Sequence, residues 1–249
     1  MPKFFVNRSQ INDGYVTIIG EDAHHISRSL RMAAGEHITV SDMQREEYDC
    51  VLCRFSEGEV VAQIVSSRHS DTEPDIRIHL FQALPKGEKL DFIIQKSVEC
   101  GVFDVTPFES DRCVVKVKEE AEGRKTERRN KIAHEAAKQC GRGIVPQIYP
   151  TVSFERMLDA ATESGAVLFC YEGEGTEPLG LALSKIRKNN NEIKDISVII
   201  GSEGGFSAKE ALTAEERGFI KIGLGKRILR TETAALFALS CLIYEFELS

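Results

Sequence analysis

The hydrophobic pattern of the first seventy residues is one of short apolar runs separated by turn residues such as Asn12–Gly14 and Gly58. Runs of this kind predict β-strands. They fall at residues 3–6, 15–19, 36–41, 47–55 and 59–67. A single helix is predicted among them, from Glu21 to Arg31. Many short strands with one helix are typical of a small β-barrel.

A polar stretch, Ser66–Asp75, contains Pro74 and predicts a domain boundary, with domains at 1–72 and 73–249. Beyond it the pattern alternates between strand and helix, which is typical of a parallel α/β sheet. The predicted strands lie at 76–84, 102–108, 144–148, 166–171, 196–200 and 219–224. The predicted helices lie near 88–100, 125–140, 153–163, 179–188, after Ser207, and 233–248, with a surface loop at Asn189–Asn191. Because knots are rare, chain physics alone predicts an open, doubly wound sheet.

Two loops follow neighbouring predicted strands in the last fifty residues. Gly201–Phe206 follows one apolar run, and Leu224–Ala234 follows the next. Glycines let a backbone turn sharply and approach a ligand closely, and Ser207–Glu210 forms a capping box that opens a helix. In a parallel sheet both loops lie at one edge, where ligands bind. A phosphate is disfavoured, because Glu203 would repel it and the P-loop spacing is absent. A simple strand-to-helix turn remains the alternative for the first loop alone.

The pair of loops, IGSEGGFS and LGKRILRTETAAL, resembles the motifs of the ribosomal RNA small subunit methyltransferase E family of the SPOUT superfamily. The resemblance runs across nearly the whole chain. It implies a knotted α/β domain with a deep trefoil knot, and an N-terminal PUA-like RNA-binding β-barrel. It also implies S-adenosylmethionine (SAM) as cofactor and methylation of N3 of one uridine in 16S rRNA within the small ribosomal subunit. Ser202 and Lys226 stand where the family usually has proline.

The resemblance, with the predicted strand end near Tyr171, also assigns the cofactor site. The assigned residues are Leu168, Tyr171, Ile200, Gly201, Glu203, Gly204, Gly205, Leu224, Gly225, Ile228, Leu229, Arg230, Thr231, Thr233 and Ala234. The final helix is apolar on almost every side, so it is expected to be buried, and by resemblance it forms a homodimer.

Methylation of uracil N3 requires loss of its proton or stabilisation of the uracil anion. Arginines near O2 or O4 supply the second, and our candidates are Arg230, Arg142 and Arg112, in that order. Glu203 is a candidate base or a ligand for the methionine amine. Glu232 is expected instead to cap the first turn of its own helix. The residues alone name no general base.

The net charge of −7 conceals a basic segment between Arg112 and Arg142, with ten Lys and Arg against five Glu. Such a segment holds RNA phosphates or is a solvated helix face. The candidate RNA-binding residues are Arg8, Arg28, Arg31, Arg128, Arg129, Gln139 and Arg142. Arg28 and Arg31 are expected to share a helix face. The run Gln139–Arg142 also resembles a family motif, and Gln139 is a candidate to contact a uracil edge. The alternative is a helix C-cap with a favourable cation near the end of the helix dipole.

The remaining composition narrows the class of protein. No run has the length of a membrane span, no leader pattern is present, and seven scattered cysteines predict reduced thiols in the cytoplasm. Cys50 and Cys53 have no second ligand pair, so no metal is expected. A nucleotide-dependent oxidoreductase would need a dinucleotide fingerprint that is missing. The alternatives left open are a related SPOUT methyltransferase acting on tRNA or other rRNA, and a non-catalytic RNA-binding assembly factor.

Overall fold

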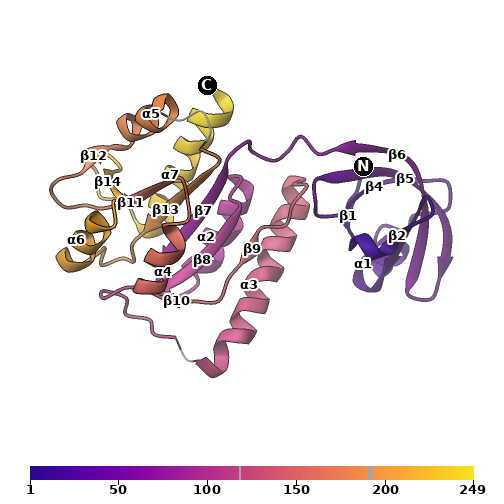
Figure 1. The fold of residues 1–249 in the computed structure, drawn as a ribbon. Coiled ribbons are helices and arrows are strands. Elements are labelled where there is room, and N and C mark those ends of the chain that lie inside the picture. Colours follow the sequence, from indigo (N-terminus) through magenta and orange to yellow (C-terminus); the bar gives the residue numbers. More distant parts are fainter. Residues whose placement is uncertain (118, 190–192) are drawn as a thin grey trace. The chain divides into compact units, whose positions relative to one another are not determined.

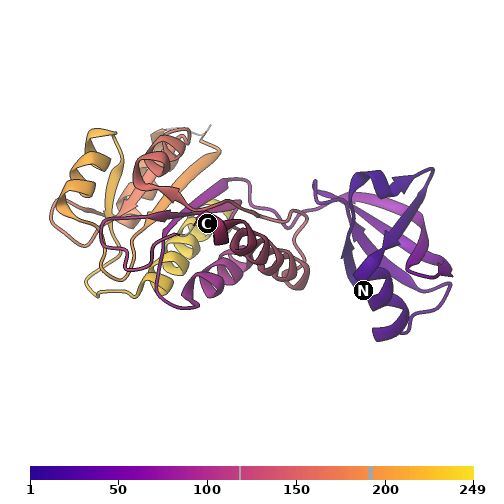
Figure 2. The ribbon, with the colours of Figure 1, turned by 90° about the horizontal axis from the view of Figure 1, so that it is seen from below.

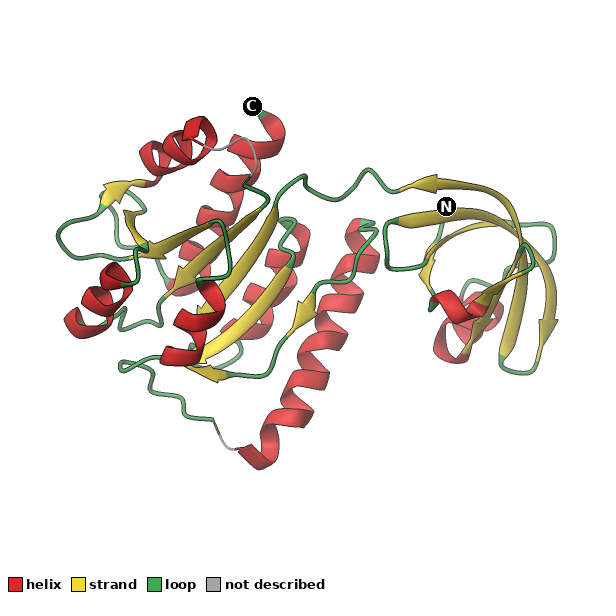
Figure 3. Ribbon diagram, in the orientation of Figure 1, coloured by secondary structure: helices red, strands yellow, loops and turns green. Residues whose placement is uncertain are grey.

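The computed structural model describes residues 1–117, 119–189 and 193–249. It divides into two compact units, which we call the first unit (1–73 with 137–145) and the second unit (74–136 with 146–249). Figure 3 shows that the first is rich in strands and that the second alternates strands with helices. The boundary between 72 and 73 stays a prediction. Lys118 of the basic segment, and Asn190 and Asn191 of the predicted loop, lie outside the described residues.

The first unit is built on a six-stranded sheet. In spatial order its strands are β1 (Lys3–Phe5), β4 (His37–Ser41), β5 (Glu46–Ser56), β6 (Glu59–His69), β3 (Tyr15–Ile19) and β2 (Ile11–Asn12). β1 pairs in parallel with β4, and the other pairs are antiparallel. Asp13 and Gly14, with φ of 49° and 79°, form the turn between β2 and β3, as a two-residue hairpin of this twist requires.

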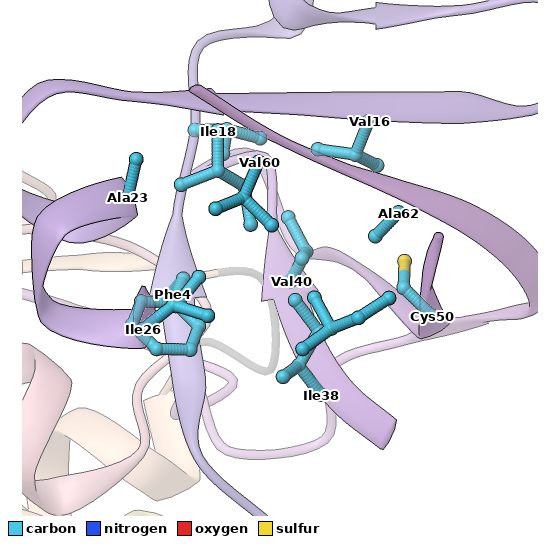
Figure 4. Packing of buried hydrophobic residues seen from close by; sticks show 12 residues of the cluster. Phe4, Val16, Ile18, Ala23, Ile26, Ile38, Val40, Cys50, Val60 and Ala62 are labelled. Carbon is cyan, nitrogen blue, oxygen red and sulfur yellow. The ribbon is translucent and has the colours of Figure 1, made fainter. Parts of the chain in front are cut away.

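Alternate residues of these strands point into one hydrophobic core, which Figure 4 shows from close by. Phe4, Ile18 and Ile38 are among its buried members, and Ile26 joins them from the helical segment. That segment consists of α1 (Gly20–His24) and a π-helical turn (His25–Ser29). It ends before Arg31, whose φ is 52°. The prediction that Arg28 and Arg31 share a helix face is therefore wrong.

The second unit is built on a parallel sheet, as predicted. Its spatial order is β10 (Val152–Ser153), β8 (Asp104–Glu109), β7 (Arg77–Ala83), β13 (Asp195–Ile200), β11 (Ala166–Cys170), β14 (Ile220–Gly223) and β12 (Glu177–Pro178), with β9 (Gln147–Ile148) also paired to β8. All of these pairs are parallel. The helices are α2 (Lys89–Glu99), α3 (Glu119–Cys140, of which residues 137–140 belong to the first unit), α4 (Phe154–Ala161), α5 (Leu179–Asn189), α6 (Ala208–Glu216) and α7 (Thr231–Ile243). The last continues as a π-helical turn, Tyr244–Leu248. α2 and α7 cover one face of the sheet, and α4 lies on the other (Figures 1 and 2).

The order of the strands in space brings three strand ends together. β11 lies between β13 and β14, with Phe169 opposite both Ile199 and Lys221. The loops that leave β13 and β14 therefore flank the end of β11. Beneath them Phe206 packs on Phe169, with ring centroids 4.3 Å apart, and stacks on Phe108 at 6.2 Å. This aromatic cluster anchors the first loop to the sheet.

In the second unit, α3 and α7 begin earlier than predicted. α3 begins at Glu119 rather than Lys125, because Glu122 accepts hydrogen bonds from the backbone and hydroxyl of Thr151 and holds the first turns. α7 begins at Thr231 and buries Ala235, Ala238, Leu239 and Leu242, yet Phe237 remains 41% exposed. In the described residues no helix has both the length and the apolar character to cross a membrane.

Candidate active site

A cavity of about 640 Å³ opens where β11, β13 and β14 end. Its walls are residues 170–173, 200–206 and 223–231, together with Lys89, Arg112, Thr176 and Ala234. This size suits a small-molecule ligand. The predicted cofactor residues all line it except Leu168, which is buried within β11, and Thr233, which is exposed on α7.

The first loop closes as a tight turn that only glycines permit. The amide of Gly205 donates to the carbonyl of Ser202 at 2.9 Å, and Gly205 has a φ of 63°. A Cβ on Gly201 would lie 3.1 Å from the Cα of Gly205. The glycines therefore keep side chains away from the turn and bring its backbone to the cavity wall.

The two loops are held together by one hydroxyl. Thr231 Oγ1 donates to the carbonyl of Gly201 at 2.6 Å and accepts from Gln82 Nε2 at 2.9 Å. Gln82 lies fully buried on β7. Sequence reasoning missed Gln82, although a polar residue within an apolar strand is a usable signal of a buried hydrogen-bond partner.

Lys89, at the start of α2, binds carboxylates from both loops. Its Nζ lies 2.9 Å from Glu203 Oε1 and 3.4 Å from Glu232 Oε2. Sequence reasoning missed Lys89 too. A cation in the first turn of a helix is unfavourable next to the helix dipole, so its presence there is a usable signal of a nearby carboxylate.

The pKa of Glu203 is lowered from its ordinary value. Burial raises it, but the hydrogen bonds from Lys89 and from the backbone, including the amide of Lys86 at 3.1 Å, outweigh burial. Glu203 is therefore ionised at neutral pH, which suits it to bind a cationic group and makes it a weak base.

Around the cavity the exposed basic side chains outnumber the exposed acidic ones, which are Glu172 and Glu203. Lys226, Arg227 and Arg230 of the second loop are exposed there, as is Arg112. One N–H of Arg112 donates to the carbonyl of Gly204 at 2.9 Å. The arrangement favours an anionic partner that reaches the cavity from outside.

The other predicted catalytic arginine, Arg142, is not among the residues that line the cavity. Arg142 belongs to the first unit, where its side chain is 5% exposed and ion-paired with Glu73. Glu73 also accepts from the amides of Gly143 and Ile144. For Arg142 to contact a substrate, this buried ion pair would have to open.

Some of the predicted RNA-binding residues are exposed and others are buried. Arg8, Arg28, Arg31, Arg128 and Gln139 are exposed, and Arg128 is paired with Asp91. Arg129 is 8% exposed and held by Glu122 at 2.9 Å.

Cys50 lies in the first-unit core, where burial raises the pKa of its thiol to about 12. Within the described residues no group of His, Cys, Asp and Glu is arranged to hold a metal ion.

A cavity at the carboxyl edge of a parallel sheet, walled by glycine loops and fringed with arginines, points to an enzyme that binds a small cofactor and an anionic substrate. A family model described as an RNA methyltransferase domain matches residues 72–243, which gives the class. Ribosomal RNA small subunit methyltransferase E of Bacillus subtilis is 34% identical over 251 residues, covering 100% of this chain and 98% of its own length. The protein of that name in Mesomycoplasma hyopneumoniae is 33% identical, covering 96% and 98%. The chain belongs to the ribosomal RNA small subunit methyltransferase E family.

Solved structures agree with this assignment. A putative methyltransferase from Legionella pneumophila, in complex with the bound cofactor SAM, has a TM-score of 0.83 and 30% identity, with 97% of this chain and 96% of the other covered. A ribosomal RNA small subunit methyltransferase E from Neisseria gonorrhoeae, bound to S-adenosyl methionine, has a TM-score of 0.81 and 28% identity, with 98% and 97% covered.

Proposed function

We propose that this protein transfers a methyl group from S-adenosylmethionine to N3 of one uridine of 16S rRNA. The observation that carries the proposal is the cavity between the two family loops, with Thr231 joining them. Family membership and the two related structures with bound SAM support it.

The residues of the cavity fit the cofactor. Its volume of about 640 Å³ is that of a small-molecule site, and Gly201, Gly204 and Gly205 leave backbone groups accessible along one wall. Glu203, which is ionised, matches a ligand with an ammonium and a sulfonium group. SAM supplies a methyl group already activated for transfer.

The chain's own residues orient the uridine and favour loss of its N3 proton. Arg112 and Arg230 place positive charge at the mouth of the cavity, where it stabilises the uracil anion through O2 or O4. Glu203, with its lowered pKa, binds the cofactor rather than removing the proton. Our proposal leaves Arg142 out of the reacting groups, because Glu73 holds it in a buried ion pair.

The set of RNA-binding residues that we propose comprises Arg8, Arg28, Arg31 and Gln139 in the first unit and Arg128 in the second, all of them exposed. It omits Arg129, which is buried against Glu122.

We further propose that the first unit is a PUA-like barrel and that the second contains the trefoil knot. We also propose that the protein acts in the cytoplasm as a homodimer on the assembled small subunit. The exposed apolar side chains of Phe237 on α7 and of Tyr244 and Leu248 on its π-helical continuation support the dimer.

A methyl-transfer assay tests the function. The protein is incubated with labelled SAM and small ribosomal subunits that lack the modification, and the labelled nucleoside is identified by mass spectrometry. We expect 3-methyluridine at one site. Arg230→Ala should lower kcat and Glu203→Gln should weaken SAM binding. Arg217→Ala, which removes an exposed arginine paired with Asp159 on α4, is the matched control and should do neither.

Two other outcomes would replace the proposal. Absence of label with SAM binding intact by calorimetry would remove the substrate assignment and favour tRNA or another rRNA. Absence of both label and SAM binding would favour a non-catalytic RNA-binding assembly factor.

A further inference from the structure

Glu210 is a buried carboxylate that serves two separate segments. Its residue is 4% exposed, in the first turn of α6. One oxygen, Oε2, accepts from the amide of Ser207 at 2.8 Å and so completes the capping box of the helix. The other, Oε1, accepts from the amide of Asp111 at 2.8 Å, ninety-nine residues earlier in the chain. A capping box needs only the first of these bonds.

A second bond joins the same two segments. Ser207 Oγ, which caps α6 by accepting from the amide of Glu210, donates to Asp111 Oδ2 at 2.8 Å. The turn that contains Asp111 is closed by the amide of Cys113, which donates to the carbonyl of Ser110 at 3.1 Å. The turn is thus fixed at its base and carries Arg112 at its tip.

Arg112 is the residue that this turn presents to the cavity. Its guanidinium donates to Gly204, and its Cβ lies against the same glycine, where an added Cβ would approach it to 3.0 Å. Four of the five N–H donors of an arginine remain after this bond. Because the side chain is exposed at the cavity wall, its direction depends on where its backbone is held.

We propose that Glu210 is a positioning residue for Arg112, and that the capping box of α6 fixes the turn that aims this arginine at the substrate. The inference rests on the proposed function for the role of Arg112 in stabilising the uracil anion. It predicts that Glu210, which does not line the cavity, governs turnover through Arg112 alone.

The test is Glu210→Gln in the full-length protein, examined first by amide hydrogen exchange. A glutamine keeps one acceptor but presents an NH₂ group to the second backbone donor, so one of the two bonds is lost. We expect the amides of residues 110–114 to exchange at least about tenfold faster than in the unaltered protein. Unchanged protection there would overturn the inference, whatever the activity.

The second measurement is a kinetic double-mutant cycle with Arg112→Ala on small ribosomal subunits. Glu210→Gln alone should lower kcat by about tenfold, because a small misplacement of a catalytic group is costly. With Arg112 already removed, Glu210→Gln should change kcat by less than about twofold. Equal losses in both backgrounds would mean that Glu210 serves only the fold, and the inference would fail.

Glu122→Gln is the matched control, since Glu122 is also a buried carboxylate that accepts a backbone amide, that of Thr151 at 2.9 Å. It should reduce thermal stability and leave kcat unchanged. If the unaltered protein methylates no RNA, the proposed function fails, while hydrogen exchange still decides whether Glu210 holds the turn.

Discussion

At the scale of single residues, the site depends on the lack of a side chain at Gly204. Gly204 has a backbone conformation open to other residues, yet a Cβ there would lie 3.0 Å from the Cβ of Arg112 and 3.4 Å from its carbonyl oxygen. The glycine is therefore required by its neighbour and not by its own dihedral angles.

Gly204→Ala should displace the turn that carries Arg112 and lower kcat by about tenfold, with little loss of stability, because the misplacement is at the reacting centre. Steady-state kinetics and thermal unfolding measure the two effects. Gly180→Ala in α5, where a Cβ meets nothing within 4 Å, is the control and should leave kcat unchanged. Unaltered turnover in Gly204→Ala would contradict the argument.

The buried ion pair of Arg142 and Glu73 gives a second prediction at this scale. Their side chains are 5% and 2% exposed. Glu73→Gln removes the charge that compensates a buried guanidinium and should destabilise the protein by about 3–5 kcal/mol. Glu215→Gln, whose carboxylate is 56% exposed beside Lys221, should cost less than about 1 kcal/mol. Urea unfolding compares them, and equal losses would refute the prediction.

At the scale of elements, three neighbouring strands share a charged clamp at their amino ends. His79 on β7 faces Asp104 of β8 through Nδ1 at 2.9 Å and Asp195 of β13 through Nε2 at 3.2 Å. Only an imidazolium donates from both ring nitrogens. Burial lowers the pKa of His79, but the hydrogen bonds and charges of Asp104 and then Asp195 outweigh burial, so its pKa lies above the ordinary 6.5.

This clamp should make stability depend on pH. Because the folded-state pKa of His79 is raised, its stabilisation is fully present below pH 6.5 and is lost as pH rises through the folded-state pKa. We expect the urea concentration at the unfolding midpoint to decrease as the pH rises from 6.5 through the raised pKa of His79. The decrease should be smaller in His79→Gln, because the glutamine side chain cannot be protonated. Urea unfolding at a series of pH values measures this. A parallel pH dependence in the variant would assign it to other groups.

Some elements have the bounds that the local sequence predicts, and others do not. β3 has its predicted bounds, Tyr15–Ile19, since a turn before it and an alternating run define it locally. The capping box at Ser207 is likewise confirmed. The start of α3 and the end of the α1 segment were misplaced, because a long-range bond to Thr151 and a left-handed Arg31 decide them.

At the scale of the whole molecule, α7 connects the site to a surface. Its first turn holds Thr231 and Ala234 at the cavity, and its other faces are divided between the core and solvent. The sequence predicts that this apolar helix is buried, in its own domain or against a partner. Within the chain Ala235 and Leu239 are covered, whereas Phe237 is 41% exposed.

If that surface is the interface of a homodimer, Phe237→Glu should convert the dimer to a monomer, because a charge at the centre of an apolar interface is costly to desolvate. Sedimentation velocity measures the change. Leu212→Glu, at a 55% exposed position on α6, is the control and should leave the assembly unchanged. A monomeric unaltered protein would remove the dimer from the proposal.

The parallel α/β character of the second unit and the two loops with their glycines can be read from the sequence, because they follow from local periodicity and from backbone geometry. The same holds for most of the residues that line the cavity, since they lie consecutively in those loops. The sequence does not reveal that β11 lies between β13 and β14, that Gln82 and Lys89 hold the loops from other elements, or that Arg129 and Arg142 are buried in ion pairs. The strand order, the contacts of Gln82 and Lys89, and the Arg142 ion pair depend on partners distant in the chain, whereas Arg129 pairs with Glu122 on its own helix. Charge patterns do not reveal whether an arginine faces solvent or a buried carboxylate.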